Sequence, residues 1–304
     1  MRYLELNEQN ILAAAETLKA GKLVAFPTET VYGLGCDAFN TAALAKVFEA
    51  KKRPRFDPLI IHIASLDTLE KLVDFSRLAA DGRHMLEVLS RSLWPGPLTL
   101  VMPKLKTVPD LATAGLETAA VRFPAHEGAC RLIAEATGAI AAPSANPFGY
   151  LSPTRAEHVR ERLGGAVDII LDGGPADIGV ESTVLDISGA TPRVLRPGGV
   201  PRETIETLVG PLAAAGGKRE TNGTAPSPGL QKSHYATRKK LFLYAADSMR
   251  RLSFFVADAY LFFDKQSFKA FAERNGLCGA DCERVFTLSE EGDANEAAAR
   301  LFDA

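Results

Sequence analysis

The chain has 304 residues, with an apolar fraction of 46% and a charged fraction of 24%, both ordinary for a globular protein. Lys and Arg total 35 and Asp and Glu total 37, so the net charge of −2 argues against binding to nucleic acid chiefly by bulk charge. The N-terminus MRYLELNEQN is polar, and no apolar run approaches the roughly 20 residues that span a bilayer. We therefore expect a cytoplasmic protein with no membrane partner.

Helical and strand patterns alternate over the first two thirds of the chain. The pattern predicts a first helix that Asn7 caps and Gly21 closes, and a second helix over 41–51. Further helices are expected near 78–92, 126–137, 154–163 and 202–209. Strands are expected at 23–26, 59–63, 98–102, 119–123, 139–142, 168–171, 183–187 and 193–195. Some strands are separated by only a few residues, which favours a mixed α/β sheet over an all-parallel one.

Composition divides the chain into three parts. Residues 1–210 carry the alternating pattern and form the predicted main domain. From Pro211 the chain is rich in Gly, Pro and small residues, which predicts a linker over 211–238. Residues 239–304 return to strand and helix patterns and predict a small α/β domain. Its last helical pattern runs to Ala304, which leaves open whether this domain is complete.

The stretch KKRPRFDPLIIH, residues 51–62, places four cationic side chains beside an apolar strand. Helix phase puts Lys51 on the buried stripe and Lys52 toward solvent. Pro54 ends the helix and favours an extended Arg53, so Lys51 and Arg53 should converge on one spot. A lysine at the edge of a core needs an anion, either a carboxylate of the protein or a ligand.

Other polar residues gather at predicted strand ends. His62 lies inside an apolar strand, where a histidine is more often a buried core residue than a ligand contact. Ser144 and Asn146 stand in a Pro-bounded loop at a strand end, the usual place for ligands in open α/β sheets. Arg196 followed by Gly198 suits an anion at the start of a helix. Each pattern also describes an ordinary βα connection, and no standard nucleotide-binding motif is present.

Together these motifs closely resemble those of the YrdC-type threonylcarbamoyl-AMP synthases. The matching stretches, in order, are FPTETVYGLG, AKKRPRFDPLIIH, WPGPLT, AVRFPAH, AAPSAN, GVESTV and LRPGG. The linker sequence APSPGLQKSHYA resembles the two-domain branch, which adds a small C-terminal Rossmann-like domain, although HYAT stands where the family usually has HYAP. The resemblance implies a mixed twisted sheet with helices on both faces around a large positive cavity.

The resemblance implies an enzyme, a nucleotidyltransferase that makes threonylcarbamoyl-AMP and pyrophosphate from ATP, L-threonine and bicarbonate or CO2. A separate threonylcarbamoyl transferase would pass the product to tRNA, forming N6-threonylcarbamoyladenosine. Mg2+ would accompany ATP, with no metal site in the protein itself, and weak direct binding of tRNA stays open. The linker would serve as a lid that keeps water from the adenylate.

The family motifs also imply roles for residues of this chain. Lys51 and Arg53 would be catalytic, offsetting the charge of the triphosphate. Contacts to ATP are implied for Lys51, Arg53, Asp57, Thr118, Ser144, Asn146, Ser152, Arg196 and Tyr235. Contacts to L-threonine are implied for Thr30, His62, Arg122, the backbone at Ala142, and Ser182. Arg122 suits the carboxylate of threonine, and His62 suits a polar end of it.

Two other classes of function remain as alternatives. One is a different enzyme on a related sheet, either a carbamoyl-adenylate-forming module of hydrogenase maturation or a dihydroxybutanone-phosphate-synthase-like lyase. The first should carry zinc-finger cysteines and the second clustered acidic ligands, and the sequence offers neither. The other is an RNA-binding protein, against which the net charge and the lack of interleaved aromatic residues count.

Overall fold

The computed structural model describes residues 1–213, 259–276 and 285–303. Ten strands form one sheet, in the order β1-β8-β2-β3-β7-β4-β6-β5-β9-β10, with parallel and antiparallel neighbours. This confirms the mixed α/β fold class. The strands are β1 (Arg2–Glu5), β2 (Val24–Phe26), β3 (Gly33–Asp37), β4 (Ile60–Ile63), β5 (Leu98–Pro103), β6 (Thr118–Arg122), β7 (Ala139–Ala141), β8 (Ile169–Asp172), β9 (Thr183–Asp186) and β10 (Arg193–Arg196).

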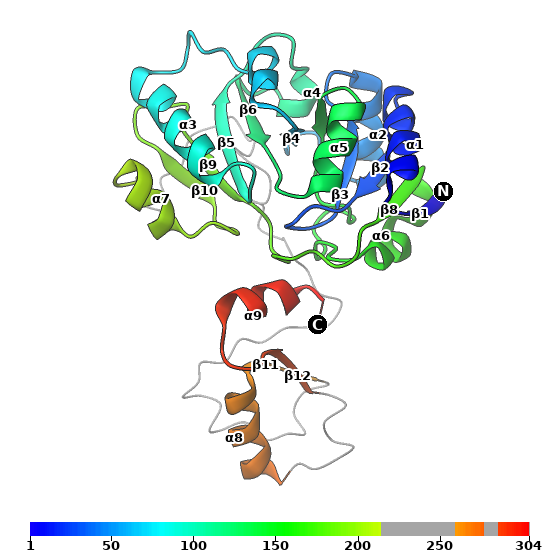
Figure 1. Cartoon of the computed structure of the whole chain (residues 1–304), viewed down its shortest axis with the longest axis vertical. Coiled ribbons are helices and arrows are strands. Elements are labelled where there is room, and N and C mark those ends of the chain that lie inside the picture. The colour runs from blue at the N-terminus through cyan, green and yellow to red at the C-terminus, as the bar shows by residue number, and fades with distance from the viewer. Residues whose placement is uncertain (214–258, 277–284, 304) are drawn as a thin grey trace.

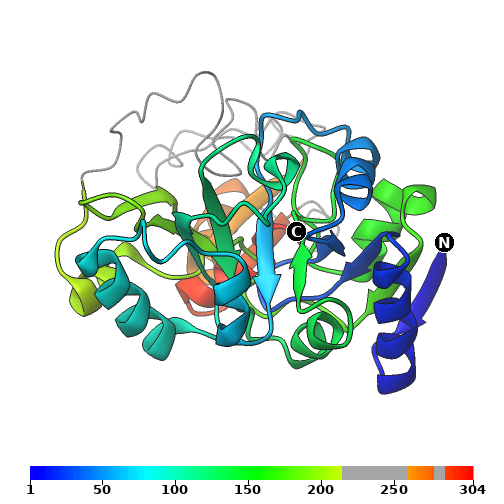
Figure 2. The ribbon, with the colours of Figure 1, turned by 90° about the horizontal axis from the view of Figure 1, so that it is seen from above.

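Helices cover both faces of this sheet, as Figures 1 and 2 show. On one face α1 and α5 pack on Val24 and Phe26 of β2, and on the other α2, α3, α6 and α7 pack on the larger core around Ala25. Strand alternation explains the division, because successive side chains of β2 point to opposite faces. The helices are α1 (Glu8–Lys19), α2 (Thr41–Lys51), α3 (Ala80–Leu93), α4 (Asp110–Thr113), α5 (Glu127–Glu135), α6 (Ala156–Leu163) and α7 (Arg202–Val209), with 3-10 turns η1 (Leu66–Lys71) and η2 (Gly164–Ala166).

Helix ends follow the sequence signals with one correction. Asn7 caps α1 as expected, since its side-chain oxygen accepts a hydrogen bond from the N–H of Asn10 at 2.9 Å. The helix α2 ends at Lys51 as expected, but the residue that stops it is Lys52, in the left-handed conformation with φ 52°, rather than Pro54. The N–H groups of Lys52 and Arg53 then bond to the carbonyls of Glu49 and Phe48, which closes the helix before the proline.

The sequence reading missed β1, β3 and α4. Strand β3 contains two glycines, and a Cβ at Gly35 would lie 2.8 Å from the ring of Phe26. The strand therefore exists because a large aromatic side chain of β2 fills the space above it. Such a strand shows no alternation of large apolar residues, so the pattern that identifies strands is absent.

The described part of the C-terminal region forms a small unit of two parallel strands and two helices. These are β11 (Tyr260–Asp264), α8 (Lys265–Asn275), β12 (Val285–Ser289) and α9 (Ala294–Leu301), drawn orange to red in Figure 1. Phe262 and Phe271 form its buried centre. The predicted linker, apart from 211–213, and the first part of the predicted small domain, up to 258, lie outside the described residues, so the domain boundaries at 210 and 239 stay predictions. Within the described ranges no helix is long and apolar enough to cross a bilayer.

Candidate active site

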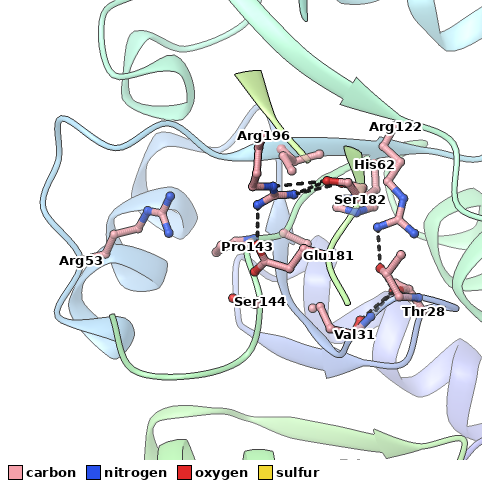
Figure 3. Close-up of a pocket in the computed structure, with 14 residues that line it drawn as sticks. Thr28, Val31, Arg53, His62, Arg122, Pro143, Ser144, Glu181, Ser182 and Arg196 are labelled. Atoms are coloured by element: carbon pink, nitrogen blue, oxygen red, sulfur yellow. Dashed lines mark hydrogen bonds and ion pairs between the residues drawn. The ribbon is translucent and has the colours of Figure 1, made fainter. Parts of the chain in front are cut away.

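A pocket that is open to solvent lies against β4 and the end of β6, on the sheet face that also carries α1 and α5 (Figure 3). Its floor comes from Ile60 and His62 of β4 and Arg122 of β6, which alternate with side chains of the opposite core. The loops after β2 and β7, the segment before β9 and the end of β10 supply the walls. The lining residues are Thr28, Thr30, Val31, Gly33, Arg53, Ile60, His62, Arg122, Ala142, Pro143, Ser144, Glu181, Ser182 and Arg196.

Lys51 supports this pocket from behind rather than lining it. Its side chain is 1% exposed, and Nζ donates hydrogen bonds to the carbonyls of Ser144 and Asn146, both at 2.5 Å. Burial, and after it the charge of Arg53, holds the pKa of Lys51 well below its usual range. The buried lysine is thus satisfied by backbone oxygens, and it fixes the loop of Ser144 and Asn146.

Arg53 lines the pocket, while Lys52 and Arg55 are exposed, as the helix phase and the position of Pro54 predicted. Its Nη2 lies 2.8 Å from Oδ2 of Asp57 and 2.8 Å from the carbonyl of Pro58. The guanidinium is also 5.8 Å from the ring centre of Phe148. Asp57 is therefore the carboxylate partner of Arg53, and burial raises its pKa although Arg53 opposes the rise. Lys51, for which a carboxylate or a ligand anion was expected, has two backbone carbonyls as its partners instead.

Arg196 forms the second arginine–carboxylate pair. Its Nη1 donates to Glu181 Oε2 at 2.6 Å, and its Nε and Nη2 donate to the carbonyl of Ser182 at 3.2 and 2.9 Å. Ser152 donates from its hydroxyl to Oε1 of Glu181 at 2.9 Å. The Gly-Gly turn after β10 fits closely here, since a Cβ at Gly198 would lie 2.2 Å from the carbonyl oxygen of Glu181. Glycine at this position thus lets the turn pack directly on the backbone that carries Glu181.

Arg122 forms the third pair. Its Nη2 donates to Oε1 of Glu29 at 2.6 Å, its Nη1 to the hydroxyl of Thr30 at 2.8 Å, and its Nε to the carbonyl of Gly96 at 3.2 Å. A guanidinium has five N–H groups, so two remain on the terminal nitrogens of Arg122. Burial lowers the pKa of Arg122, while Glu29 acts in the opposite direction. Arg122 is therefore a fixed cation in the floor of the pocket, with two N–H donors that no described residue accepts (Figure 3).

His62 lies buried between Phe26 and Arg122. Its ring meets that of Phe26 edge to face, with 6.4 Å between centroids. Burial and the neighbouring charge of Arg122 lower the pKa of His62 to about 3, so the imidazole is neutral at physiological pH. Nδ1 has no hydrogen-bond partner in the part of the chain that is described. His62 is therefore buried in its strand and also lines the pocket. A core position and a position open to a ligand do not exclude each other here.

Buried polar atoms without partners cluster around this pocket. Within the described ranges they include Oε2 of Glu29, Nδ1 of His62 and Oδ1 of Asn146. Most buried polar atoms of a folded protein are satisfied, so such a cluster marks a place where a polar ligand can complete the hydrogen bonds. No group of three His, Cys, Asp or Glu residues that could hold a metal occurs within those ranges.

Most of the sequence-predicted site residues come together in the structure. Eight line the pocket: Thr30, Arg53, His62, Arg122, Ala142, Ser144, Ser182 and Arg196. Lys51, Asp57, Asn146 and Ser152 contact these residues or their partners from behind. The N–H of Ala142 already donates to the carbonyl of Ile60 at 2.9 Å, which leaves its carbonyl for a ligand. Their predicted roles toward ATP and threonine stay predictions.

Among the described residues, one predicted site residue is not brought to the pocket. Thr118 begins β6, two positions before Ala120 and four before Arg122, and it is not among the lining residues. Tyr235 lies outside the described residues.

Sequence reasoning missed Glu29 and Glu181 as site residues. Both stand inside quoted motifs, FPTETV and GVESTV, yet neither was singled out. A charge argument could have found them, because three inward arginines in a protein interior each require a nearby counter-charge.

Comparisons with known proteins match this chain to two family models. A family model described as Telomere recombination, which covers the Sua5, YciO and YrdC proteins, matches residues 16–198. A second model, described as Threonylcarbamoyl-AMP synthase, C-terminal domain, matches residues 200–304. The two models together account for nearly the whole chain.

Individual relatives are similar over most of the chain. The threonylcarbamoyl-AMP synthase of Pyrococcus abyssi is 44% identical over 98% of this chain and 85% of its own length. That of Bacillus subtilis is 47% identical over 77% of this chain and 66% of its own length. A crystal structure of P. abyssi Sua5 complexed with L-threonine matches with a TM-score of 0.78 and 39% identity, over 99% of this chain and 86% of that one.

Proposed function

Because this chain belongs to the threonylcarbamoyl-AMP synthase family, we propose that it is a nucleotidyltransferase that joins L-threonine, bicarbonate or CO2, and the AMP part of ATP. The products are threonylcarbamoyl-AMP and pyrophosphate. The observation that carries the proposal is the pocket, which gathers three buried arginines beside a neutral histidine in a chain 44% identical to a synthase of this name. The product then serves tRNA modification through a separate threonylcarbamoyl transferase.

Arg122 and His62 are the groups that suit the amino acid. The two remaining N–H groups of Arg122 match a carboxylate, and the guanidinium is held in place by Glu29, Thr30 and the carbonyl of Gly96. A neutral imidazole offers one donor and one acceptor, which suits a hydroxyl rather than a second charge. The P. abyssi relative, crystallised with L-threonine, supports the choice of this substrate.

Arg53, Arg196 and the Ser144–Asn146 loop are the groups that suit the nucleotide. In the reaction the neutral amine of threonine captures CO2 as a carbamate, a carbamate oxygen attacks the α-phosphorus, and pyrophosphate leaves. The chain needs no nucleophile for this sequence, because charge neutralisation and positioning do the work. Lys51 contributes by anchoring the carbonyls of Ser144 and Asn146.

Mg2+ is proposed as the companion of ATP. The carboxylates at the site, Asp57, Glu29 and Glu181, are each ion-paired with an arginine, and no acidic cluster occurs in the described part of the chain. The described side chains of the site therefore offer no cluster of unpaired carboxylates to a metal ion. The phosphates of ATP and water are the ligands that Mg2+ prefers in such sites.

The test is release of pyrophosphate from ATP with each amino acid, with and without bicarbonate. We expect release that needs both L-threonine and bicarbonate, with serine a weaker substrate because it lacks the methyl group. Arg122→Gln should raise the KM for threonine far more than that for ATP. If none of the amino acids tested supports pyrophosphate release, the proposal is overturned. If release does not depend on bicarbonate, the carbamate step is wrong.

A further inference from the structure

The segment from Gly173 to Ser182 connects β8 to β9 and joins two of the three arginine pairs. The N–H of Ile178 donates to the carbonyl of Glu29 at 2.8 Å, and the side chain of Glu29 holds Arg122. Three residues later, Glu181 holds Arg196. The position of this segment, called here the 173–182 loop, therefore fixes the partners of two arginines in the pocket.

The outer side of the 173–182 loop contacts the small C-terminal unit. Gly179 has φ +69°, and a Cβ built on it would lie 2.4 Å from the carbonyl oxygen and 2.6 Å from the Cα of Ala299 in α9. The backbone of α9 therefore rests directly on Gly179, with no room for a side chain between them. Figure 1 shows α9 as the part of the small unit that lies nearest the large sheet.

A second contact ties the same helix to the base of the loop. Asp303, just after α9, receives two hydrogen bonds from Arg155, from Nε at 2.7 Å and from Nη2 at 2.9 Å. Arg155 follows Thr154, whose carbonyl accepts the N–H of Ala176 in the loop at 2.8 Å. A two-pronged arginine–carboxylate contact fixes orientation as well as distance. The C-terminal unit thus contacts the loop directly at Gly179. Through Asp303 it also binds Arg155, the residue next to Thr154, which accepts a hydrogen bond from the loop.

We propose that α9 and Asp303 are positioning elements of the active site, which hold the 173–182 loop and through it Glu181, Ser182 and Arg196. The inference rests on the proposed function. Within the described ranges, no residue of the C-terminal unit lines the pocket. It sets how firmly the loop presents Arg196 to the nucleotide and Ser182 to the amino acid.

The first test reverses the charge of Asp303 in the full chain. Asp303→Arg places a cation opposite Arg155, so the contact becomes repulsive and the loop loses its outer support. We expect faster hydrogen exchange of the loop amides and a five- to tenfold higher Kd for ATP by calorimetric titration. The kcat at saturating substrate should change less than twofold, because the reacting groups remain.

Two further variants separate positioning from general damage. Arg155→Asp alone should reproduce the effect, and Arg155→Asp combined with Asp303→Arg should restore both the exchange rate and the Kd. The matched control is Lys265→Glu, which breaks an exposed ion pair with Glu290 in the same C-terminal unit, a pair that involves neither Arg155 nor Asp303. This control should behave as the wild type in all three measurements.

Wild-type exchange and ATP affinity in both single charge-reversal variants would overturn the inference. Equal effects from Lys265→Glu would overturn it as well, since the response would then not belong to this contact. The outcome is separable from that of the proposed function. If the wild type fails to release pyrophosphate with threonine and bicarbonate, the proposed function fails, whereas the exchange and ATP-binding measurements still report on the contact.

Discussion

Arg53, Arg122 and Arg196 each form an ion pair with a carboxylate of their own, at 2.8, 2.6 and 2.6 Å. Buried ion pairs add little net stability, because desolvation of both partners offsets much of their attraction. Their role here is to orient the guanidinium groups, because each carboxylate holds its arginine side chain in one direction. Lys51 differs from them, because its hydrogen-bond partners are two backbone carbonyls.

Replacing Lys51 tests whether its anchoring of the loop matters for turnover. Lys51→Met should lower kcat/KM for pyrophosphate release by about 100-fold, the size expected when a segment that positions the substrate shifts by about 1 Å. Leaving two carbonyls without a donor should also cost about 1–3 kcal/mol of unfolding free energy. Lys46→Met is the matched control, because Lys46 donates to the carbonyl of Gly21 from the same helix but outside the pocket. Full activity of Lys51→Met would contradict the role.

His62 predicts an acid-dependent loss of stability. Its pKa in the folded chain is about 3, below the ordinary value of 6.5, so the unfolded chain takes up the proton first. The stability from the neutral ring is complete above pH 6.5 and is lost as pH falls toward 3. By pH 4.5 the loss should reach about 2–3 kcal/mol. Urea unfolding of the wild type and His62→Gln at pH 7.5 and 4.5 checks this, and equal pH slopes for both would refute it.

At the scale of elements, the sequence predicted what a local pattern can encode. The helix at 41–51 and the strand at 183–187 appear with ends matched to within one residue, because an apolar stripe or run specifies each. β3 was missed because its existence depends on the ring of Phe26 packing over two glycines, which is a tertiary contact. Pairing of Arg122 with Glu29, 93 residues apart, depends on sheet order and is likewise invisible in a local pattern.

The end of α2 offers a stability prediction. Lys52 is exposed and holds a left-handed conformation that costs a residue with a Cβ about 1 kcal/mol, whereas glycine adopts it freely. Lys52→Gly should therefore raise the free energy of unfolding by about 0.5 kcal/mol, after the loss of its charge at the helix end. Glu49→Gly, exposed on the same helix, should instead lower it by about 1 kcal/mol. Thermal unfolding of both variants measures the contrast, and a lower Tm for Lys52→Gly would contradict it.

At the scale of the whole molecule, the expected positive cavity is balanced by its own carboxylates, and the net charge of the chain is −2. This distribution predicts weak tRNA binding that falls steeply with salt, because the net charge is slightly negative and the three pocket arginines are already paired with carboxylates. Unmodified tRNA should leave the rate of pyrophosphate release unchanged. Fluorescence titration between 50 and 200 mM salt, with a parallel pyrophosphate assay, measures both. Tight binding at 200 mM salt together with stimulation would restore the RNA-binding alternative.

The three arginine–carboxylate pairs should also affect the rate of product release. A phosphate group that enters must share or displace a carboxylate already seated on the guanidinium, so part of its binding energy is offset. When pyrophosphate forms, Asp57 and Glu181 are already beside Arg53 and Arg196 and can take its place at once. We expect these carboxylates to act as internal competitors that hold affinity at a moderate level, so that product release keeps pace with synthesis.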